Sequence, residues 1–257
     1  MNDPDITRLL TLKSNTLPVT ISYDPKESNL LPSGEFVTAI PYKKQGLMHR
    51  KMIAIDGELI LLGSTNLTPL ALKIHKNMIA CIRSKELYQA ILQNRPLEKP
   101  AFSFYPLPES GELALKKLLD AINTAKKKVH VCIFTFTHEE IAKALISANL
   151  RGIDVKVYLD KGSASGTSKK IVQMLRHHQV PTFTHLGGGL LHHKCALIDS
   201  TFVFGSTNFT KAAFSKNEEH LFFLHSPPPS ALNSINSLFH HLEKSTHKLP
   251  NSENTTC

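Results

Sequence analysis

The stretch LHHKCALIDSTFVFGSTNFT, residues 191–210, sets five polar side chains among apolar residues of the kind that form strands. These side chains are His192, Lys194, Asp199, Ser206 and Asn208. In a strand, residues i and i+2 point to the same face, so His192 and Lys194 are expected to project together. An imidazole beside an ammonium group repels cations and suits an anion such as a phosphate. Ser206 and Asn208 add a hydroxyl and a carboxamide that can donate to phosphoryl oxygens.

Nearly the same pattern occurs earlier, in LMHRKMIAIDGELILLGSTNLT at residues 47–68. Both copies read HxKxxxxD followed by GSTN, with one residue fewer between the aspartate and the glycine in the later copy. The earlier copy offers these counterparts of the five residues above: His49, Lys51, Asp56, Ser64 and Asn66. A lone HxK pair is common, whereas two copies of the whole pattern in one chain indicate an internal repeat.

The repeat extends upstream of both motifs and favours an α/β fold. VTISYD at 19–24 resembles VKVYLD at 155–160, and both alternate as strands do. The later copy is preceded by further periodic segments: a strand-like FSFYP at 102–106, a helical pattern at 112–125, a buried strand at 129–136 and a helix that ends at Gly152. Strands that alternate with helices predict a largely parallel sheet. We therefore expect two related modules, each a mixed β-sheet flanked by helices.

The stretch RPLEKPA at residues 95–101 places two prolines and several charges between apolar segments and is expected to separate the modules. The expected organisation is a first module at 1–99, a complete second module at 100–247 and a polar tail at 248–257. Counting back from His49 leaves no room for the opening strand, helix and strand of the later copy. The first module is therefore expected to be truncated.

The composition favours a polyanionic partner. The chain has 257 residues, with 30 Lys+Arg against 21 Asp+Glu and a net charge of +9. Such a charge attracts nucleic acid or an anionic membrane surface, although it also serves solubility alone. The first residues, MNDPDITRLL, lack the basic and apolar regions of a signal peptide, and no apolar run approaches the roughly 18 residues of a membrane span. We therefore expect a cytoplasmic protein or one that is peripheral at a membrane.

The cysteines indicate free thiols rather than a disulfide framework. Four are present, widely spaced and without a CxxC pair: Cys81, Cys132, Cys195 and Cys257. The first three lie in apolar, strand-like surroundings and are expected to be buried. Free thiols fit a reducing compartment.

If the two motifs meet, the site holds two histidines, two lysines and two asparagines. One histidine can attack phosphorus while the other protonates the leaving oxygen. The lysines and asparagines stabilise the charge that grows on the phosphoryl oxygens, so the reaction needs no metal ion and no cofactor. A zinc site at His192 and His193, with the nearby His185, is the alternative. It is disfavoured because no cysteine or carboxylate stands at ligand spacing and Lys194 would repel a cation.

The duplicated HxKxxxxD and GSxN motifs resemble the phospholipase D superfamily, whose paired motifs form one site across a pseudo-twofold axis. The second module is also similar to the short single-motif members, the bacterial endonucleases and mitochondrial cardiolipin hydrolases, which pair as homodimers. The segments that carry this likeness are CIFTFTHEEIAKAL, VYLDKGSASG and GSTNFTKAAFSKNEE. The resemblance implies a phosphohistidine intermediate that is transferred to water or an alcohol. It implies His49 as the nucleophile and His192 as the general acid, because two-motif members usually use the N-terminal histidine.

The resemblance also implies roles for the acidic residues. In the family, a glutamate after GSxN hydrogen-bonds the histidine and sets its tautomer, and Glu219 occupies that place. The first copy has Asn77 there, so His49 is expected to lack a carboxylate partner. Asp56 and Asp199 are motif members that are expected to tie adjacent backbone and strands.

Three functions fit these observations. The duplicated motif is shared with full-length lipases of the family and favours hydrolysis of a phospholipid head-group bond. The likeness of the second module to nucleases favours cleavage of DNA or RNA by the same chemistry. The truncated module and Asn77 favour an inactive relic that binds polyanions. In either active form, the alternative to a site within one chain is a homodimer in which two chains pair through their second modules.

Overall fold

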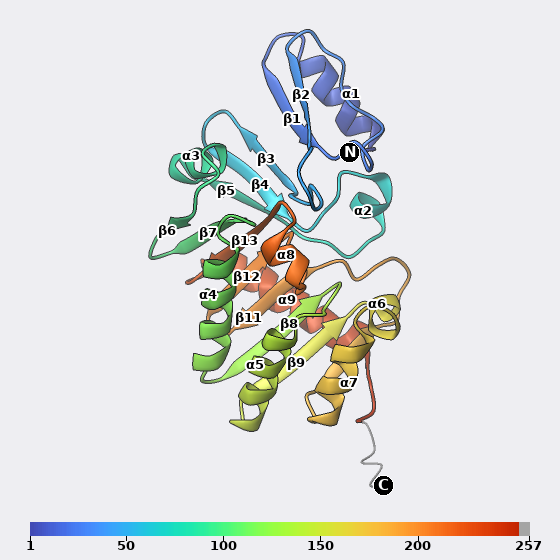
Figure 1. Ribbon diagram of the computed structural model, residues 1–257, viewed down its shortest axis with the longest axis vertical. Coiled ribbons are helices and arrows are strands. Elements are labelled where there is room, and N and C mark those ends of the chain that lie inside the picture. The colour runs from blue at the N-terminus through green and yellow to red at the C-terminus, as the bar shows by residue number, and fades with distance from the viewer. Residues whose placement is uncertain (252–257) are drawn as a thin grey trace.

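The computed structural model describes residues 1–251 and contains three β-sheets (Figure 1). The largest has nine strands in the order β14-β10-β9-β8-β11-β12-β13-β7-β6. In that order they span Thr246–Lys248, Thr182–His185, Asp154–Leu159, Lys128–Ile133, Lys194–Ile198, Thr201–Gly205, Glu219–Leu224, Phe102–Leu107 and Leu97–Glu98. Pairing is parallel from β8 through β9 to β10 and antiparallel elsewhere. The mixed α/β fold is confirmed, whereas the expectation of a largely parallel sheet is wrong, because β11 to β13 follow one another as antiparallel neighbours.

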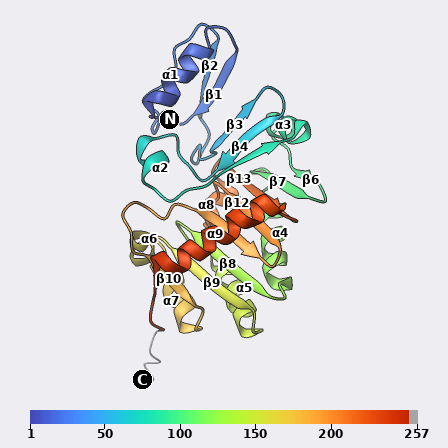
Figure 2. The same ribbon diagram turned by 180° about the vertical axis from the view of Figure 1, so that it is seen from behind.

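Helices cover both faces of this large sheet. They are α4 (Gly111–Thr124), α5 (Glu139–Leu150), α6 (Lys161–Ser165), α7 (Lys169–His177), α8 (Lys211–Ser215) and α9 (Pro229–Ser245). Figure 1 shows α4, α5 and α7 on one face, and Figure 2 shows α9 running across the other. In α4 the buried Ala114, Leu118 and Ile122 recur every four residues, so the helix presents one apolar stripe to the strands.

The first module is built from two smaller sheets. One has three antiparallel strands, β3 (Met52–Ile55), β4 (Leu59–Gly63) and β5 (Ile79–Arg83). The other has two parallel strands, β1 (Val19–Tyr23) and β2 (Val37–Pro41). Its helices are α1 (Pro4–Lys13), α2 (Pro69–Lys73) and α3 (Lys85–Leu92). Figures 1 and 2 both place α1 against the β1–β2 sheet, beyond the three-stranded sheet.

A strand-by-strand comparison explains why the first module is split. In the second module, β8 pairs with β9 on one side and with β11 on the other. The first module repeats β9 and β10 as β1 and β2, and repeats β11 to β13 as β3 to β5. Among residues 1–99, nothing corresponds to β7, α4 and β8, so the two groups of strands form separate sheets. Among the described residues, the first module thus lacks the strand that joins β9 to β11 in the second module.

The two segments expected at the boundaries of the second module each contribute a strand to the large sheet. The stretch at 95–101 contains β6, which pairs with β7 at the edge of the large sheet. The tail expected at 248–257 begins within β14, and its residues 252–257 lie outside the described part of the chain. Among residues 1–251, no helix combines the length and the apolar character needed to cross a bilayer.

The cysteines match the expectation only in part. Cys132 and Cys195 are buried free thiols on the neighbouring strands β8 and β11. Cys81 is free but exposed, because the face of β5 on which it lies has no covering helix among the described residues. Cys257 falls outside the described residues.

Candidate active site

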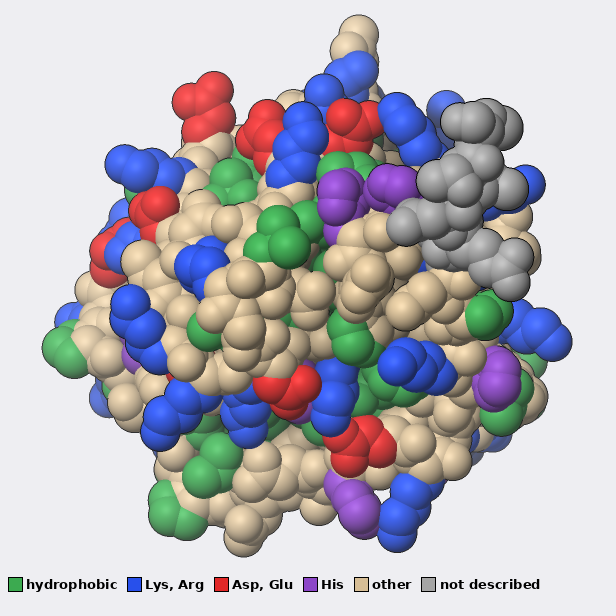
Figure 3. Space-filling view, turned by 90° about the horizontal axis from the view of Figure 1, so that it is seen from below, with side chains coloured by type: hydrophobic (Ala, Val, Ile, Leu, Met, Phe, Trp, Pro, Cys, Tyr) green, Lys and Arg blue, Asp and Glu red, His purple; other side chains and the backbone are tan. Residues whose placement is uncertain are grey.

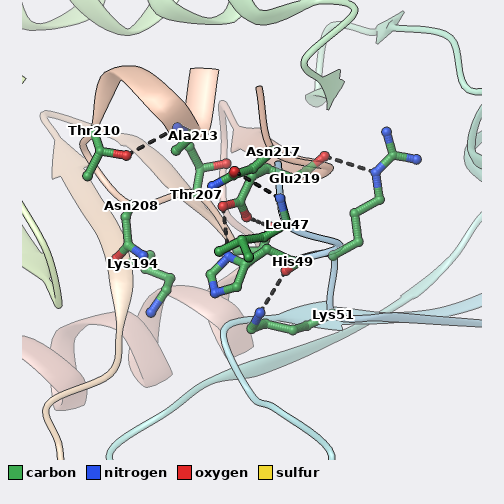
Figure 4. A network of polar contacts seen from close by, with 12 residues as sticks. Leu47, His49, Lys51, Lys194, Thr207, Asn208, Thr210, Ala213, Asn217 and Glu219 are labelled. Atoms are coloured by element: carbon green, nitrogen blue, oxygen red, sulfur yellow. Dashed lines mark hydrogen bonds and ion pairs between the residues drawn. The ribbon is translucent and has the colours of Figure 1, made fainter. Parts of the chain in front are cut away.

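Each His-x-Lys segment is held by the backbone of the other module. The His49 N–H donates to Glu218 O at 2.9 Å, and the Glu218 N–H returns a bond two residues upstream of His49 at 2.8 Å. The His192 N–H donates to Lys76 O at 2.9 Å, and the Lys76 N–H returns a bond two residues upstream of His192 at 2.8 Å. These matching pairs bring the two motifs together at one site between the modules. Figure 4 shows His49 and Lys51 of the first module beside Lys194 of the second.

The side chains that orient the histidines are exchanged between the modules. His49 Nδ1 lies 2.7 Å from Glu219 Oε1, and His192 Nδ1 lies 3.0 Å from Asn77 Oδ1. The expectation that His49 lacks a carboxylate partner is therefore wrong. It paired each histidine with the residue that follows in its own copy, whereas the crossed backbone bonds place each histidine beside the other copy's residue. His49 has the carboxylate and His192 has the amide.

The two GSTN serines lie beneath these orienting side chains. Ser64 Oγ donates to Asn77 Oδ1 at 3.0 Å, and Ser206 Oγ donates to Glu219 Oε2. Both serines are fully buried, and each hydroxyl also accepts a backbone N–H from the residue after the orienting side chain. The sequence led us to expect these hydroxyls at the substrate. In the structure they hold Asn77 and Glu219 in place.

The two GSTN asparagines have different surroundings. Asn208 is half-buried, and its Oδ1 accepts the Thr135 N–H at 3.2 Å. Thr135 follows β8, and residues 1–99 contain no counterpart of that segment. Asn66 is accordingly exposed. The pseudo-symmetric site is thus more open on the side of Asn66.

The motif aspartates lie at the far ends of their strands from the histidines. Asp199 carboxylate oxygens accept the backbone N–H groups of residues 126, 127 and 128 at 2.8, 2.8 and 3.0 Å. These bonds lower the pKa of Asp199 even though burial raises it. Asp56 occupies the equivalent turn, with the same positive φ of 50°, and is exposed. Both aspartates therefore shape hairpin turns and do not join the histidines, although their motif membership made them candidates for the catalytic set.

The two motif lysines are arranged alike. Lys51 Nζ donates to His49 O at 2.7 Å, and Lys194 Nζ donates to His192 O at 3.0 Å. Burial lowers the pKa of Lys51 to about 8. Burial and the nearby Lys51 also lower the pKa of Lys194, whose side chain is only 1% exposed and lies 5.1 Å from the centre of the Phe134 ring. Two ammonium groups in one buried site favour an anionic ligand.

Both histidines are neutral in the ligand-free protein at pH 7. Burial lowers the pKa of His49 and outweighs the opposing effect of Glu219. Burial, followed by repulsion from Lys194 and Lys51, lowers the pKa of His192 to about 2. Removing that repulsion requires negative charge between the lysines. A bound phosphodiester supplies it.

The structure adds residues that the motif analysis missed. Arg50 donates to Glu219 O at 3.1 Å and pairs with Glu218 Oε2 at 2.8 Å, so it braces the segment that carries the orienting carboxylate. The rings of Phe134 and His75 flank His192, with centroids 4.8 and 6.4 Å from its own. In the sequence, Arg50 lies between the motif residues His49 and Lys51, so its position in the motif could have indicated it. No comparable pattern marks Phe134 or His75.

Replacing Lys194 with methionine is expected to stabilise the protein at pH 7. Because burial lowers the pKa of Lys194, the folded chain holds this proton less tightly than the unfolded chain does. The charge therefore opposes folding at pH 7, and the penalty fades as the pH rises toward the ordinary lysine pKa of 10.5. We expect Lys194→Met to raise the free energy of unfolding by about 1–3 kcal/mol at pH 7 and by less at pH 10.

Urea unfolding at the two pH values measures this difference. Lys116→Met, at an exposed position on α4, is the matched control and is expected to change stability little. A Lys194→Met protein less stable than wild type at pH 7 would contradict the prediction.

A model of one protein family matches both motifs of this chain. The family model described as "Cardiolipin synthase, PLD-like domain" matches residues 15–94 and 118–243, which include both motifs. The chain belongs to the phospholipase D-like family. The match spans both modules, so this phospholipase D-like chain carries the family's paired motifs in a single polypeptide.

Individual relatives match different parts of this phospholipase D-like protein. The human "Mitochondrial cardiolipin hydrolase" is 31% identical over an alignment of 139 residues, and the match covers 49% of this chain and 52% of the relative. The structure of "a phospholipase D family member, Nuc from Salmonella typhimurium" is 28% identical, with a TM-score of 0.54, and covers 59% of this chain and 99% of its own. The chain thus spans about half the length of the curated relatives it matches.

A third likeness concerns the two-module arrangement. The "phosphatidylserine synthase" of Haemophilus influenzae Rd KW20 has a TM-score of 0.69 over 95% of this chain and 77% of its own, at 13% identity. At that identity the likeness shows the fold alone. It covers the first module as well as the second.

Proposed function

We propose that this chain is a phosphodiesterase that cleaves its substrate through a covalent phosphohistidine formed on His49. The observation that carries the proposal is the 2.7 Å contact between His49 Nδ1 and Glu219 Oε1. A carboxylate that accepts the Nδ1 proton leaves the Nε2 lone pair free to attack. It also stabilises the positive ring that forms when Nε2 bonds to phosphorus. His192 faces the neutral amide of Asn77 at the same position and serves as the proton donor.

The proposed reaction has two steps. In the first, His49 Nε2 bonds to phosphorus while the bond to the leaving oxygen breaks and that oxygen takes a proton from His192. In the second, His192 takes a proton from water, the water oxygen bonds to phosphorus, and the bond to His49 breaks. An alcohol in place of water gives transfer instead of hydrolysis. In both steps Lys51 and Lys194 stabilise charge on the phosphoryl oxygens, so the reaction requires no metal ion.

The remaining motif residues have supporting roles in this proposal. The amides of Asn66 and Asn208 bind phosphoryl oxygens. Ser64 and Ser206 position the orienting side chains beside which they lie. Asp199 ties its hairpin turn to the N–H groups of residues 126–128, and Asp56 occupies the equivalent turn.

Anion binding is expected to take up a proton at His192. The pKa of about 2 reflects burial and repulsion from two lysines, and an anion between the lysines offsets that repulsion. Calorimetric titration with sulfate near pH 6, in buffers of different ionisation enthalpy, is expected to show uptake of up to about one proton per site. His192→Gln is expected to bind sulfate without this uptake. Binding to wild type with no proton uptake would contradict the role of His192 as the acid.

The substrate that the structure favours is an anionic phospholipid. Leu70, Leu72 and Ile74 on and after α2 are 58, 38 and 49% exposed, just before the site residue His75. The loop that meets them adds Leu186 and Leu190, which are 65 and 37% exposed. We call these five residues the apolar rim. An apolar border beside a cationic site suits a lipid head group at a membrane surface.

Two further observations bear on nucleic acid as the alternative substrate. The net charge of +9 suits a nucleic acid as well as an anionic membrane. On the face seen in Figure 3, however, lysine and arginine side chains are scattered among acidic ones and form no continuous stripe. A nucleic-acid groove usually shows such a stripe. That face lies away from the first module and does not display the site, so the apolar rim carries the preference for the lipid and for a peripheral location at a membrane.

One chain is sufficient for the proposed site. Lys76 and Asn77 of the first module already occupy the position beside His192 that the second module of another chain would need. We therefore propose that activity does not depend on pairing of two second modules. Activity that appears only in a dimer would contradict this.

Hydrolysis of two substrates in EDTA tests the proposed function. Vesicles that contain cardiolipin and single-stranded DNA are each incubated with wild type, His49→Ala and His192→Ala. Cleavage of the vesicle lipid, abolished by His49→Ala, is the expected result. Leu72→Ser with Ile74→Ser is expected to weaken vesicle cleavage at least tenfold while sparing a soluble short-chain diester. Cleavage of DNA alone would favour the nuclease, and no cleavage by folded protein would favour the polyanion-binding relic.

A further inference from the structure

The two sides of the entrance to the site have equivalent backbones. Gly189, in the loop before the second motif, lies so close to the backbone of Ile74 that there is no room for a Cβ. Gly46, in the loop before the first motif, lies equally close to the backbone of Lys216. Each glycine stands three residues before its motif histidine, so the two contacts are counterparts in the repeat. Differences between the two sides therefore come from the side chains.

The side chains at these equivalent positions differ in character. On the side of the second motif, Ile74 and Leu186 of the apolar rim are 49 and 65% exposed. Their counterparts on the side of the first motif are Lys216 and Lys43, both exposed, which we call the basic rim. Within residues 1–251, neither lysine of the basic rim forms an ion pair. The entrance is thus apolar on one side and positively charged on the other.

Acidic residues near the basic rim are already paired. Glu218 Oε1 lies 3.0 Å from Lys44 Nζ, and its Oε2 lies 2.8 Å from an Arg50 nitrogen. Glu109 lies 3.6 Å from Lys44 and 3.7 Å from Arg50. These two carboxylates and two cations offset one another. The charges of the basic rim therefore remain available to an anionic ligand.

The basic rim lies directly beside His49. The loop that carries Lys43 is bonded to the segment that carries Lys216, because Asn217 Oδ1 accepts the Leu47 N–H at 3.1 Å. Leu47 O also accepts a backbone N–H from the residue after Asn217. Figure 4 shows Leu47 and Asn217 together with His49. The apolar rim has the corresponding place beside His192.

The proposed reaction gives these two sides different meanings. Displacement at phosphorus proceeds roughly in line, so the leaving oxygen is opposite the attacking atom. With His49 as the nucleophile and His192 as the acid, the departing alcohol lies on the side of His192 and the apolar rim. The other alcohol stays on the phosphorus that His49 holds, and the basic rim is the part of the entrance next to His49.

We propose that the two rims fix the direction in which the substrate lies across the site. The substrate is a phosphodiester between an alcohol with apolar chains and an alcohol with a second anionic group, such as a phosphate. The bond from His49 Nε2 to phosphorus forms, the bond to the apolar alcohol breaks, and its oxygen takes a proton from His192. The basic rim holds the anionic half until water releases it as a phosphate monoester. This inference rests on the proposed function.

A diester with two different ends tests the direction directly. Its phosphate joins octanol to 3-phosphopropanol, two primary alcohols, and the products are separated by mass spectrometry. The expected result is release of octanol over 3-phosphopropanol by at least about tenfold. Lys43→Gln with Lys216→Gln should reduce this preference by at least about threefold. Equal release of the two alcohols, or preferred release of 3-phosphopropanol, overturns the proposal.

The matched control removes the same charge elsewhere. Lys126→Gln with Lys127→Gln changes two exposed lysines beside Asp199, at the far end of the strands from the histidines. This control variant is expected to keep the wild-type preference. A loss of preference as large as that of the basic-rim variant would assign the effect to net charge and overturn the proposal.

Binding without turnover tests the basic rim separately from the proposed activity. Propane-1,3-diyl bisphosphate is expected to bind at least about fivefold more tightly than propyl phosphate in calorimetry. The basic-rim variant, shown to be folded by circular dichroism, should lose this gain, whereas the control variant should keep it. A gain that persists in the basic-rim variant overturns the proposal. Wild type that shows the gain but cleaves neither end of the diester would retain the anion subsite and contradict the proposed phosphodiesterase.

Discussion

Replacing His49 with alanine is expected to lower the rate of phosphodiester cleavage by at least about 10⁴-fold, because the proposed nucleophile is removed. The loss should be the same for an ordinary diester and for one with a nitrophenolate leaving group. A good leaving group needs no proton, but it still needs a nucleophile. The measurement is the initial rate with each substrate, after circular dichroism has shown that the variant is folded.

His192→Ala is expected to behave differently with the same two substrates. The ordinary diester needs a proton on its leaving oxygen, so its cleavage should fall by about 10²–10⁴-fold. The nitrophenyl diester should still react with His49 and release a burst of about one equivalent of nitrophenolate. Turnover should then stall, since the second step lacks its base. A burst in His49→Ala and none in His192→Ala would exchange the two roles.

The sequence was sufficient to predict which residue types meet at the site, because those residues belong to a repeated motif. Two copies of HxKxxxxD and GSTN indicated an anion site with two histidines and two lysines, and the structure brings these four together. The number of residues given before His49 also predicted that they contain no counterpart of the strand, helix and strand that open the second module. These inferences depend only on residue types and on their spacing along the chain, and not on which segments are in contact in three dimensions.

The pairing of the histidines could not be read in the same way. In the sequence, Glu219 follows His192 and Asn77 follows His49, so sequence order assigns each residue to the histidine of its own copy. The exchange arises from backbone bonds between modules, at His49 to Glu218 and at His192 to Lys76. No local pattern encodes which segment of one module lies against the other. The same limit explains Ser64 and Ser206, whose hydroxyls lie beneath the orienting side chains instead of at the substrate.

The apolar periodicity of the sequence likewise could not predict that the strands of the first module form two separate sheets. β1 to β5 each have the expected strand character, and their counterparts lie in one sheet. They separate because the joining strand β8 has no equivalent among residues 1–99. Cys81 was expected to be buried for the same reason: its strand pattern is that of a covered sheet, and the cover is what the described first module lacks.

Exchanging the two orienting side chains, the carboxylate beside His49 and the amide beside His192, is expected to move the nucleophile from one histidine to the other. Glu219→Gln keeps the shape of the side chain but replaces the carboxylate beside His49 with an amide. We expect kcat to fall by about 10²–10³-fold, since the positive ring of the intermediate loses its counter-charge. Asn77→Asp alone places a carboxylate beside His192 and is expected to make either histidine competent.

The double variant Asn77→Asp with Glu219→Gln reverses the arrangement seen in the structure. His192 Nδ1, which lies 3.0 Å from Asn77 Oδ1, then has the carboxylate, and His49 has the amide. If the carboxylate selects the nucleophile, part of the activity lost in Glu219→Gln should return, and the phosphoryl group trapped by rapid denaturation should lie on His192 instead of His49. Peptide mapping of the trapped protein locates it. A phosphoryl group that stays on His49 in the double variant would show that another asymmetry of the site, such as Phe134 beside His192, makes the choice.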